Sequence, residues 1–475
     1  MCKRISCDDH PKEFCGLFGI YGNPEASWVT YLGLYAQQHR GEESCGIVSS
    51  DGHDVYSHRA MGQVCDVFNE ETLKSLKGHI AIGHVRYSTT GSSLVKNAQP
   101  LFVDYLGSYL AIGHNGNLVN SYSLRKELEA KGSIFQTTCD SEIIIHLMAR
   151  AKTDDLAEKL IFALKKIKGA YSLVMMAEEK LIAVRDPLGF RPLCLGKLKD
   201  KWCVASESCA LDLIEASYVR DVEPGEAVII DEQGMRSVRF GPPKKKCAFC
   251  IFEHVYFSRP DSIVFGETVH LVRQKLGEAL AHEYPTKADI VVPIPDSGTS
   301  AALGFSRASG IPLEFGVIRN HYIGRTFIQP HQNIRDLGVR VKMNILKEVV
   351  KGKRVVIVDD SIVRGTTSRI RVNNFRRAGA KEVHMRISCP PHKFPCFYGI
   401  DFPDQKELIA HRHSMKEIEQ FLDVDSLGYL STEGMLGAVS FPKEQYCTAC
   451  WTGKYPTCVD KQHGKFILEE GGGTQ

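Results

Sequence analysis

One stretch of this sequence, residues 354–368, constrains the fold more than any other. It reads Arg-Val-Val-Ile-Val-Asp-Asp-Ser-Ile-Val-Arg-Gly-Thr-Thr-Ser. The β-branched run at residues 355–358 is too short for a helix and is typical of a strand buried on both faces. Gly365 favours a tight turn, and the hydroxyl residues after it can cap a helix that runs to about Ala378, with Gly379 just past its end. The stretch therefore predicts a βα unit of a parallel α/β sheet.

Two carboxylates, Asp359 and Asp360, stand at the end of the predicted strand. Backbone N–H groups at a helix N-terminus, together with hydroxyls, form a cradle for a phosphate. The carboxylates cannot bind phosphate directly, but they can hold the hydroxyls of a sugar and, through water, Mg2+. No Gly-Lys-Ser/Thr follows Gly365, so the stretch is not a Walker A loop. An ordinary βα unit with a solvated acidic turn is the alternative, and it leaves the rare Asp-Asp and Gly-Thr-Thr-Ser combination unexplained.

These residues resemble the phosphoribosylpyrophosphate (PRPP) motif of the type I phosphoribosyltransferases. The resemblance implies that PRPP is bound by Asp359, Asp360, Arg364, Gly365, Thr366, Thr367 and Ser368. Residues 290–300 are a second strand, turn and helix start, similar to the pyrophosphate loop of the family, and Pro293 and Pro295 indicate the end of a strand. By resemblance, Ser297 joins Asp359 and Asp360 at a Mg2+ site.

The segment at residues 322–342 is polar and rich in Gly, Arg and Gln. Its length and composition predict a lid that closes on a polyanion, with Arg325 and Lys342 as further PRPP ligands. A plain surface loop is the alternative.

The chain as a whole has 475 residues, too many for one core, which predicts two or three domains. A net charge of +3 with 24% charged residues gives no indication of nucleic acid or of an anionic membrane as a partner. No apolar run approaches the ~18 residues that span a bilayer, and the N-terminus lacks the apolar core of a secretion signal. We therefore expect a cytoplasmic protein, in which the 16 cysteines are thiols, nucleophiles or metal ligands rather than disulfides.

Cys15 begins a glycine-rich apolar strand, Cys-Gly-Leu-Phe-Gly-Ile-Tyr-Gly, after 14 mostly polar residues. A buried core cysteine is the common alternative to a nucleophile. Farther on, an i, i+3, i+4, i+7 pattern predicts a helix face that packs on a sheet, made of Trp28, Tyr31, Leu32 and Tyr35. Four polar clusters follow, and two of them come directly after β-like runs, which predicts functional loops at strand ends; the clusters are residues 38–44, 86–91, 114–118 and 139–142.

The Cys15 strand and the four clusters together resemble the glutaminase domain of the N-terminal-nucleophile (Ntn) amidotransferases, over residues 15–240. The resemblance implies a four-layer αββα sandwich, an α+β fold, in which residues 1–14 are a propeptide and Cys15 becomes the N-terminus. A thiol pKa near 8.5 and an α-amine pKa of about 7.7–8.0 are close enough for the amine to act as the base for the thiol. Glu13 and Phe14 stand where family members commonly have two acidic residues, so the rate of processing stays open.

The same resemblance assigns the remaining roles in the glutaminase site. Asn115 and Gly116 form the oxyanion hole for the intermediates on Cys15. Arg86 binds the α-carboxylate of glutamine through its planar fork, and Asp140 holds the α-ammonium. A catalytic histidine is not required, so we expect structural roles for His39, His84 and His114.

A glutaminase followed by a PRPP-binding domain resembles the amidophosphoribosyltransferase family, from Cys15 to about Pro456. The expected organisation is a propeptide (1–14), an amidotransferase domain (15–240), an α/β phosphoribosyltransferase domain (250–440) and a cysteine-containing tail (441–475). The implied reaction transfers the amide nitrogen of glutamine to C1 of PRPP, giving 5-phosphoribosylamine, glutamate and pyrophosphate at the start of de novo purine biosynthesis. The family also implies a homotetramer and feedback inhibition by purine nucleotides.

Two other classes of protein fit parts of the sequence. A hexosamine-forming amidotransferase would share the first half but needs a sugar-isomerase second half, which the pair Asp359 and Asp360 argues against. A non-catalytic regulator that binds PRPP would have no reason to keep Cys15, Asn115 and Asp140 together. The presence of both sets of residues favours catalysis.

The cysteines near the second domain allow two metal sites. By spacing alone, Cys247-x-x-Cys250 and Cys447-x-x-Cys450 predict a four-cysteine zinc site. By resemblance, Cys250, Cys396, Cys447 and Cys450 hold a [4Fe-4S] cluster, found in some members of the family. Four thiolates suit either metal, but the residues that flank the second set match the family, so we favour the cluster. Its role is expected to be structural, because neither half-reaction moves electrons.

Overall fold

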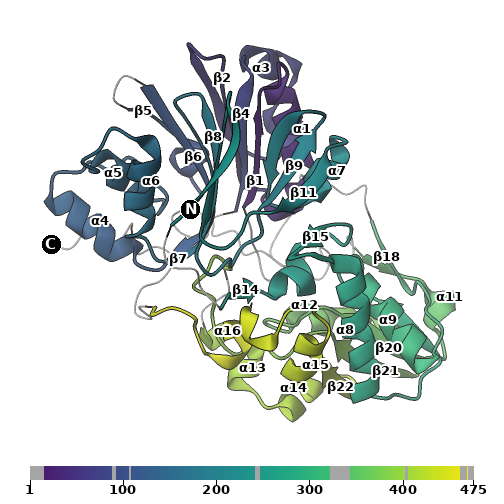
Figure 1. The fold of residues 1–475 in the computed structure, drawn as a ribbon. Helices are drawn as coiled ribbons and strands as arrows, with labels where there is room; N and C mark the ends of the chain where they lie inside the picture. The colour runs from purple at the N-terminus through teal and green to yellow at the C-terminus, as the bar shows by residue number, and fades with distance from the viewer. Residues whose placement is uncertain are drawn as a thin grey trace.

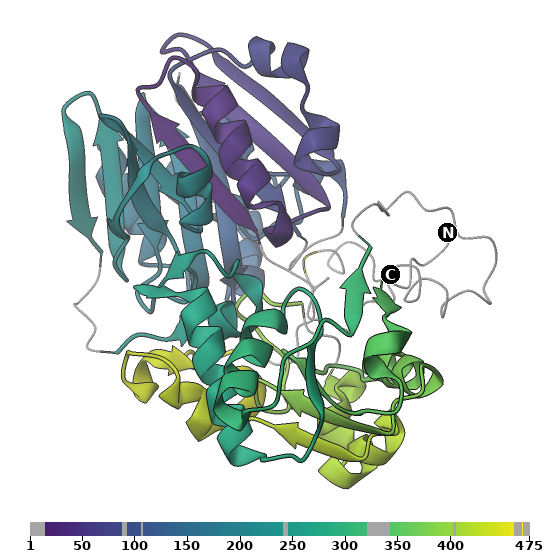
Figure 2. The same ribbon diagram turned by 90° about the vertical axis from the view of Figure 1, so that its right-hand side faces the viewer.

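The computed structural model describes residues 15–87, 93–105, 108–240, 246–320, 343–401, 405–459 and 468. An N-terminal sandwich of two β-sheets packs on a second half built around a parallel sheet (Figure 1). Figure 2 shows the two halves one above the other, with the sandwich at the top. The predicted propeptide lies outside the described residues.

The first sheet of the sandwich is antiparallel, with strand order β11-β9-β10-β1-β4-β2-β3. Its glycine-rich strand β1 lies in the middle, and a Cβ on Gly19 would lie 2.8 Å from Leu181 and 2.9 Å from Val174 of the other sheet. Glycine at this position therefore lets the two sheets approach closely. The strands are β1 (Gly16–Tyr21), β2 (Ser44–Ser50), β3 (Val55–Met61), β4 (Ile80–Arg86), β9 (Cys194–Leu198), β10 (Lys201–Ala205) and β11 (Ser217–Asp221).

The second sheet is also antiparallel and has the order β13-β12-β8-β7-β6-β5. Apolar side chains from the facing sides of both sheets form one buried cluster, which includes Leu17, Ile82, Val174 and Val228. The bounds are β5 (Leu101–Tyr105), β6 (Ser108–Leu118), β7 (Gly169–Ala177), β8 (Lys180–Arg185), β12 (Glu226–Asp231) and β13 (Gly234–Arg239).

Helices cover the outer face of each sheet, which confirms the predicted αββα layers (Figure 1). The first sheet carries α1 (Ala26–Ala36), α2 (Val64–Val67), α3 (Glu70–Ser75) and α7 (Cys209–Leu213). The second sheet carries α4 (Ser121–Ala130), α5 (Glu142–Ala149) and α6 (Leu156–Leu164). Short 3-10 turns occur at Gln38–Arg40 and Val95–Asn97.

The predicted packing face of α1 is wrong. Trp28, Leu32 and Tyr35 are 37%, 38% and 52% exposed, and Tyr31 is only partly buried, with its ring against that of Phe68. The helix instead lies on the sheet through its smaller residues, because a Cβ on Gly33 would lie 2.3 Å from the ring of Phe18. A pattern of apolar residues does not show which side chains are small enough to let the helix approach the sheet this closely. The buried residues of α1 are Ala26, Ser27, Thr30, Gly33, Leu34 and Ala36.

The second half is built on a four-stranded parallel sheet of order β17-β20-β21-β22. Its strands are β17 (Ile290–Pro293), β20 (Arg354–Asp359), β21 (Glu382–Ile387) and β22 (Ser426–Tyr429). The predicted buried strand is β20, in the interior of the sheet, and β17 lies at the edge, where a proline is tolerated. The helices are α8 (Val269–Glu283), α9 (Thr299–Ser309), α11 (Lys347–Val350), α12 (Thr366–Arg377), α13 (Ile409–Arg412), α14 (Met415–Leu422) and α15 (Thr432–Gly437).

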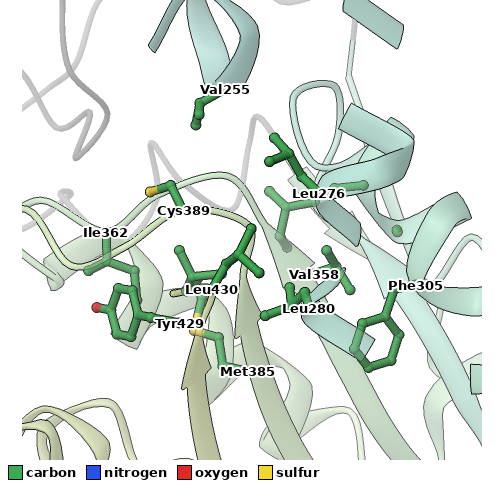
Figure 3. Packing of buried hydrophobic residues seen from close by; sticks show 14 of the residues in the cluster. Val255, Leu276, Leu280, Phe305, Val358, Ile362, Met385, Cys389, Tyr429 and Leu430 are labelled. Carbon is green, nitrogen blue, oxygen red and sulfur yellow. The ribbon is translucent and has the colours of Figure 1, made fainter. Parts of the chain in front are cut away.

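One apolar core joins these strands and helices. Figure 3 shows Leu276 and Leu280 of α8 and Phe305 of α9 facing Val358 of β20 and Met385 of β21. Burial of such side chains supplies most of the free energy that holds the layers together.

Helix α12 follows the prediction closely. Gly365 precedes it with φ of 79°, Ala378 ends it, and Gly379 follows with φ of 90°. Both glycines thus occupy left-handed backbone conformations that other residues rarely adopt.

Short elements connect the two halves and the tail. Strand β14 (Phe249–Cys250) pairs in parallel with β23 (Tyr446–Cys447), which joins the interdomain segment to the C-terminal part of the chain. Between β14 and α8 lies a π-helix, Glu253–Phe257. The other small elements are β15 (Ile263–Val264), β16 (Glu267–Thr268), β18 (Val317–Arg319), β19 (Met343–Ile345), α16 (Ala449–Thr452) and the 3-10 turns Gln405–Glu407 and Lys443–Gln445. Across the described ranges, no helix has the length and apolar character needed to cross a membrane.

Candidate active sites and a cysteine cluster

Cys15 immediately precedes the central strand of the first sheet. It is 6% exposed, and its Sγ lies 3.7 Å from the carbonyl oxygen of Tyr87. Gly16 pairs with Val85 of β4, so the strand register brings the end of β4, with Arg86, beside Cys15. The nucleophile and the arginine that the resemblance assigned to one site are therefore neighbours.

Asn115 and Gly116 lie within strand β6, so the predicted loop at residues 114–118 is wrong. The sequence predicted a loop there because polar side chains are rarely buried in a strand without a hydrogen-bond partner. Gly116 has φ of 147°, and a Cβ on it would lie 2.0 Å from the carbonyl oxygen of Ala170, so only glycine fits. Asn115 is buried, and its Nδ2 has no hydrogen-bond partner among the residues that the structure describes.

Asp140 is buried at the start of α5, next to the same strand. It accepts a hydrogen bond from the Leu118 N–H at 2.8 Å and lies 3.5 Å from His114 Nδ1. Burial alone would raise the pKa of Asp140, but His114 and the N–H donors outweigh it, so the pKa is below its ordinary value. Arg86 is also buried, with Nη1 3.9 Å from Glu43 Oε2. The site thus offers buried groups of both signs, the Asp140 carboxylate and the Arg86 guanidinium, with the Glu43 carboxylate beside the guanidinium.

The histidines of this half occupy structural positions, as expected. His84 Nε2 lies 3.0 Å from the carbonyl oxygen of His114, and this contact links the two sheets. Burial lowers the pKa of His84 to about 3, so its ring is neutral. His39 Nε2 lies 2.8 Å from Glu207 Oε1.

A buried network of four charges next to Cys15 was not predicted. Arg40 donates from Nε to the Cys15 carbonyl oxygen at 3.2 Å, and its Nη1 pairs with Glu207. Glu253 of the π-helix accepts from Arg40 Nη2 at 3.0 Å and from Arg191 Nη1 at 3.2 Å. The sequence carried one signal for this network, because the charged Glu253, followed by His254, interrupts the mainly apolar segment at residues 249–257.

Arg191 also holds a segment of the second half against the sandwich. Its Nε and Nη2 donate to the carbonyl oxygen of Tyr398 at 3.1 and 2.7 Å. Asn117 Nδ2, from β6, donates to the Phe397 carbonyl oxygen at 3.0 Å. The strand that carries Asn115 and Gly116 is therefore in direct contact with the segment that follows Cys396.

The second candidate site lies at the end of β20. Asp360 accepts hydrogen bonds from Ser297 Oγ at 2.5 Å and from Ser361 Oγ at 2.6 Å. Asp359 forms a buried ion pair with Arg371 Nη1 at 2.7 Å, a partner that the sequence did not reveal. The structure thus brings Ser297 and Asp360 together, as the resemblance implied, and both supply the oxygen ligands that Mg2+ prefers. Asp359 lies beside them with its charge compensated.

The first turn of α12 faces the same region. A Cβ on Gly365 would lie 2.8 Å from Ile409 Cδ1, so the turn is tightly enclosed. Thr366 is exposed, whereas Thr367 and Ser368 are buried. Arg364 pairs with Glu407 through Nε at 2.7 Å. The predicted lid, with Arg325 and Lys342, lies outside the described residues.

The cysteines group as the resemblance implied. The β14–β23 pairing sets Cys250 opposite Cys447. Burial, and after it the thiols of Cys447, Cys396 and Cys250, raise the pKa of Cys450. The Tyr398 N–H donates to Cys396 Sγ at 3.3 Å, a contact common for cluster ligands.

Cys247 does not share this environment. After burial, the charges that act on its pKa are those of Arg185, Asp186 and Glu223 rather than those of other cysteines. In the described part of the chain, no three Cys, His, Asp or Glu side chains lie close enough to hold a single metal ion. A four-iron cluster does not need such convergence, because each thiolate binds a different iron. The thiols of Cys250, Cys396, Cys447 and Cys450 act on one another's pKa, and these four cysteines are the set that the resemblance assigned to a [4Fe-4S] cluster.

Comparisons with known proteins cover both halves. The family model for the glutamine amidotransferase domain matches residues 84–213, and that for the phosphoribosyl transferase domain matches residues 267–393. An amidophosphoribosyltransferase of Methanocaldococcus jannaschii is 50% identical over 464 residues, 94% of this chain and 98% of the relative. One of Bacillus subtilis is 49% identical over 450 residues, 94% of each chain, and a chloroplastic one of Arabidopsis thaliana is 50% identical over 451 residues, 94% of this chain and 80% of the relative.

A solved structure supports the same relationship. Glutamine PRPP amidotransferase from B. subtilis, complexed with ADP and GMP, superimposes with a TM-score of 0.91 at 47% identity, covering 96% of this chain and all of that one. With sequence, fold and both domains in agreement, the chain belongs to the amidophosphoribosyltransferase family.

Proposed function

We propose that this chain transfers the amide nitrogen of glutamine to C1 of PRPP, giving 5-phosphoribosylamine, glutamate and pyrophosphate. The observation that carries the first half-reaction is the buried Nδ2 of Asn115, a donor without a partner among the described residues. Such a group costs free energy unless a hydrogen-bond acceptor binds it, and a tetrahedral oxyanion is the strong acceptor that forms in amide hydrolysis.

Glutamine hydrolysis follows from the groups around Cys15. After removal of residues 1–14, the α-amine of Cys15 accepts the thiol proton, and the thiolate attacks the amide carbon. Asn115 Nδ2 and the Gly116 N–H stabilise the oxyanion, and the α-ammonium of Cys15 returns its proton to the amide nitrogen. Collapse of the intermediate then releases ammonia and leaves a thioester that water hydrolyses. Arg86 and Asp140 hold the α-carboxylate and α-ammonium of the substrate.

Synthesis of phosphoribosylamine uses the groups at the end of β20. The N–H groups and hydroxyls of Thr366, Thr367 and Ser368 hold the 5-phosphate, while Asp359 and Asp360 hold the ribose hydroxyls. Ser297 and the carboxylates would hold Mg2+, which neutralises the charge of the departing pyrophosphate. Ammonia passes between the halves out of contact with bulk water, because protonation would remove its nucleophilic lone pair.

The cofactor and regulation complete the proposal. Cys250, Cys396, Cys447 and Cys450 hold a [4Fe-4S] cluster that ties the interdomain segment to the tail. Purine nucleotides act as inhibitors, which is in keeping with the ADP and GMP bound to the B. subtilis relative. We expect a homotetramer in the cytoplasm.

Replacement of Cys15 tests the division of labour. Cys15→Ala should abolish synthesis from glutamine, while free ammonia at high pH still supports it. Cys45→Ala is the matched control, since Cys45 is buried in β2 of the same sheet and should keep both activities. Product analysis with amide-labelled glutamine and PRPP identifies the transferred nitrogen. Loss of the ammonia reaction in folded Cys15→Ala would contradict the two-site mechanism.

A further inference from the structure

Arg40 connects Cys15 to a carboxylate of the second half. Its Nε donates to the Cys15 carbonyl oxygen at 3.2 Å, while Nη1 and Nη2 donate to Glu253 Oε2 and Oε1 at 3.1 and 3.0 Å. A guanidinium is planar and rigid, so a carboxylate that holds both terminal nitrogens also fixes the direction of Nε. The Cys15 carbonyl belongs to the residue that carries the reacting thiol, so its position limits where Sγ can lie.

Glu253 itself is fixed from both sides. Arg191 of the sandwich donates to its Oε1, and Ser258 Oγ donates to its Oε2 at 2.8 Å. Arg273 of α8 holds the backbone of the π-helix through the carbonyl oxygens of His254, at 2.7 Å, and Ser258, at 2.8 Å. A π-helix is rare and is frequently found at functional sites. The second half thus places the negative charge of Glu253 in a fixed position beside the nucleophile of the sandwich.

We propose that Glu253 is a positioning residue for glutamine hydrolysis: it fixes Arg40 and, through it, Cys15, so that the second half completes the glutaminase site. The inference rests on the proposed role of Cys15 as the nucleophile.

The charge balance of the network makes the proposal testable. Arg40, Arg191, Glu207 and Glu253 carry two positive and two negative charges, and all four side chains are fully buried. His39, 27% exposed, also contacts Glu207 at 2.8 Å and is the same in wild type and in both Glu253 variants. Glu253→Gln keeps the shape of the side chain but leaves one positive charge uncompensated near Cys15. That charge favours thiolate over thiol and amine over ammonium, so the acid limb of the pH profile should move to lower pH, by about half a unit or more. A purely structural ion pair would change stability without this shift.

The experiment measures glutaminase kcat and KM against pH in the mature, full-length protein. Glu253→Gln should lower kcat on the order of 10- to 100-fold, because a small misplacement of the nucleophile is costly, and should show the shifted acid limb. Glu253→Asp keeps the charge, so it should restore the position of the acid limb while kcat stays reduced. Synthesis from ammonia and PRPP should stay within about twofold of wild type in both variants, since Cys15 takes no part in it.

A matched control is available in the sandwich. Glu226 is buried and accepts two hydrogen bonds from Arg220, both at 2.8 Å, on a strand that does not contact Cys15. Glu226→Gln should leave kcat and the pH profile of glutamine hydrolysis as in wild type.

Three outcomes would overturn the proposal. In the first, Glu253→Gln keeps the kcat and pH profile of wild type, as Glu226→Gln should. In the second, Glu253→Gln loses the glutamine and ammonia reactions equally as its Tm falls, which is what an ion pair with only a structural role between the halves would do. If Glu253→Gln fails to fold, an unchanged kcat in Glu253→Asp overturns the proposal. Cys15→Ala is measured in parallel, and glutamine-dependent synthesis in that variant would refute the proposed function instead.

Discussion

The backbone of Gly399 lies against that of Gly116. A Cβ on Gly399 would lie 3.0 Å from the carbonyl carbon and 3.1 Å from the Cα of Gly116, and Gly399 has φ of 99°. The segment that follows Cys396 therefore touches the strand that carries the proposed oxyanion donors. The second half contributes to the glutaminase site at two places, Glu253 beside Cys15 and Gly399 beside Gly116.

Gly399→Ala should impair the use of glutamine and spare the use of ammonia. The new Cβ would displace Gly116, and alanine at this φ carries roughly 1–3 kcal/mol of strain. We expect kcat/KM for glutamine to fall at least about tenfold, since the oxyanion donors must be placed within a fraction of an ångström. Gly437→Ala in α15 is the control, because its Cβ meets nothing within 4 Å. An equal loss with ammonia would argue against a local effect on the glutaminase site.

The two carboxylates of the PRPP site should respond differently to the same change. Asp359→Asn removes the buried ion pair with Arg371, and the loss of one partner of such a pair costs about 3–5 kcal/mol of stability. Asp360→Asn keeps an oxygen that can accept from Ser297, so its main effect should be a higher KM for PRPP. Basal glutaminase at saturating glutamine should survive in Asp360→Asn.

The double variant Asp359→Asn, Arg371→Gln separates stability from binding. It removes both charges, so thermal stability should recover while PRPP use stays impaired. Unchanged PRPP kinetics in both single variants would refute the assignment of these carboxylates.

The sequence predicted correctly those elements that are determined by residues close together in the chain. The β-branched run before Asp359, the left-handed glycine at Gly365 and the helix to Arg377 are each determined by residues within one turn or strand. The same reasoning placed Cys15 at the start of a strand, whereas Arg86 was assigned to its site only by the resemblance.

The features that were missed depend on residues far apart in the chain. Arg40 and Glu253 are 213 positions apart, and no spacing rule relates them. The face of α1 was misassigned because close packing on the sheet needs small side chains, which a hydrophobicity pattern does not report. Asn115 and Gly116 were expected in a loop because buried strands seldom carry polar residues without partners, except where a ligand supplies the partner.

Cysteine substitutions should decide between the two metal sites. Anaerobically purified protein should be brown and contain iron and sulfide. Cys396→Ser should lose the cluster and much of the stability, whereas Cys247→Ser, the matched control two residues before β14, should keep both. Colourless protein with one zinc per chain, unaffected by Cys396→Ser, would establish the zinc site instead.

Acid should destabilise this protein between about pH 6.5 and 4, through histidines buried as neutral rings. Burial lowers the pKa of His84 and of His392 to about 3 and that of His254 to about 4, against about 6.5 in an unfolded chain. In this window the unfolded state binds more protons than the folded state, so stability falls as pH falls. Asp186 acts in the opposite direction, because burial raises its pKa to about 6 and its protonation stabilises the folded state.

The contribution of a single buried histidine to this loss of stability can be measured. From pH 7 to 5 each of the three histidines should cost about 2 kcal/mol of stability and Asp186 should offset about 1 kcal/mol, so a net loss of about 4–5 kcal/mol is expected. Neither ring nitrogen of His254 has a hydrogen-bond partner within the described residues, and its ring packs edge-on to Phe265. Leucine can therefore replace the neutral ring without the loss of a hydrogen bond. His254→Leu should remove about half of the acid-dependent fall in Tm. His411→Leu, at an exposed position in α13, should leave the fall unchanged. A His254→Leu protein that loses as much Tm as wild type on acidification would show that buried neutral histidines do not set the acid sensitivity.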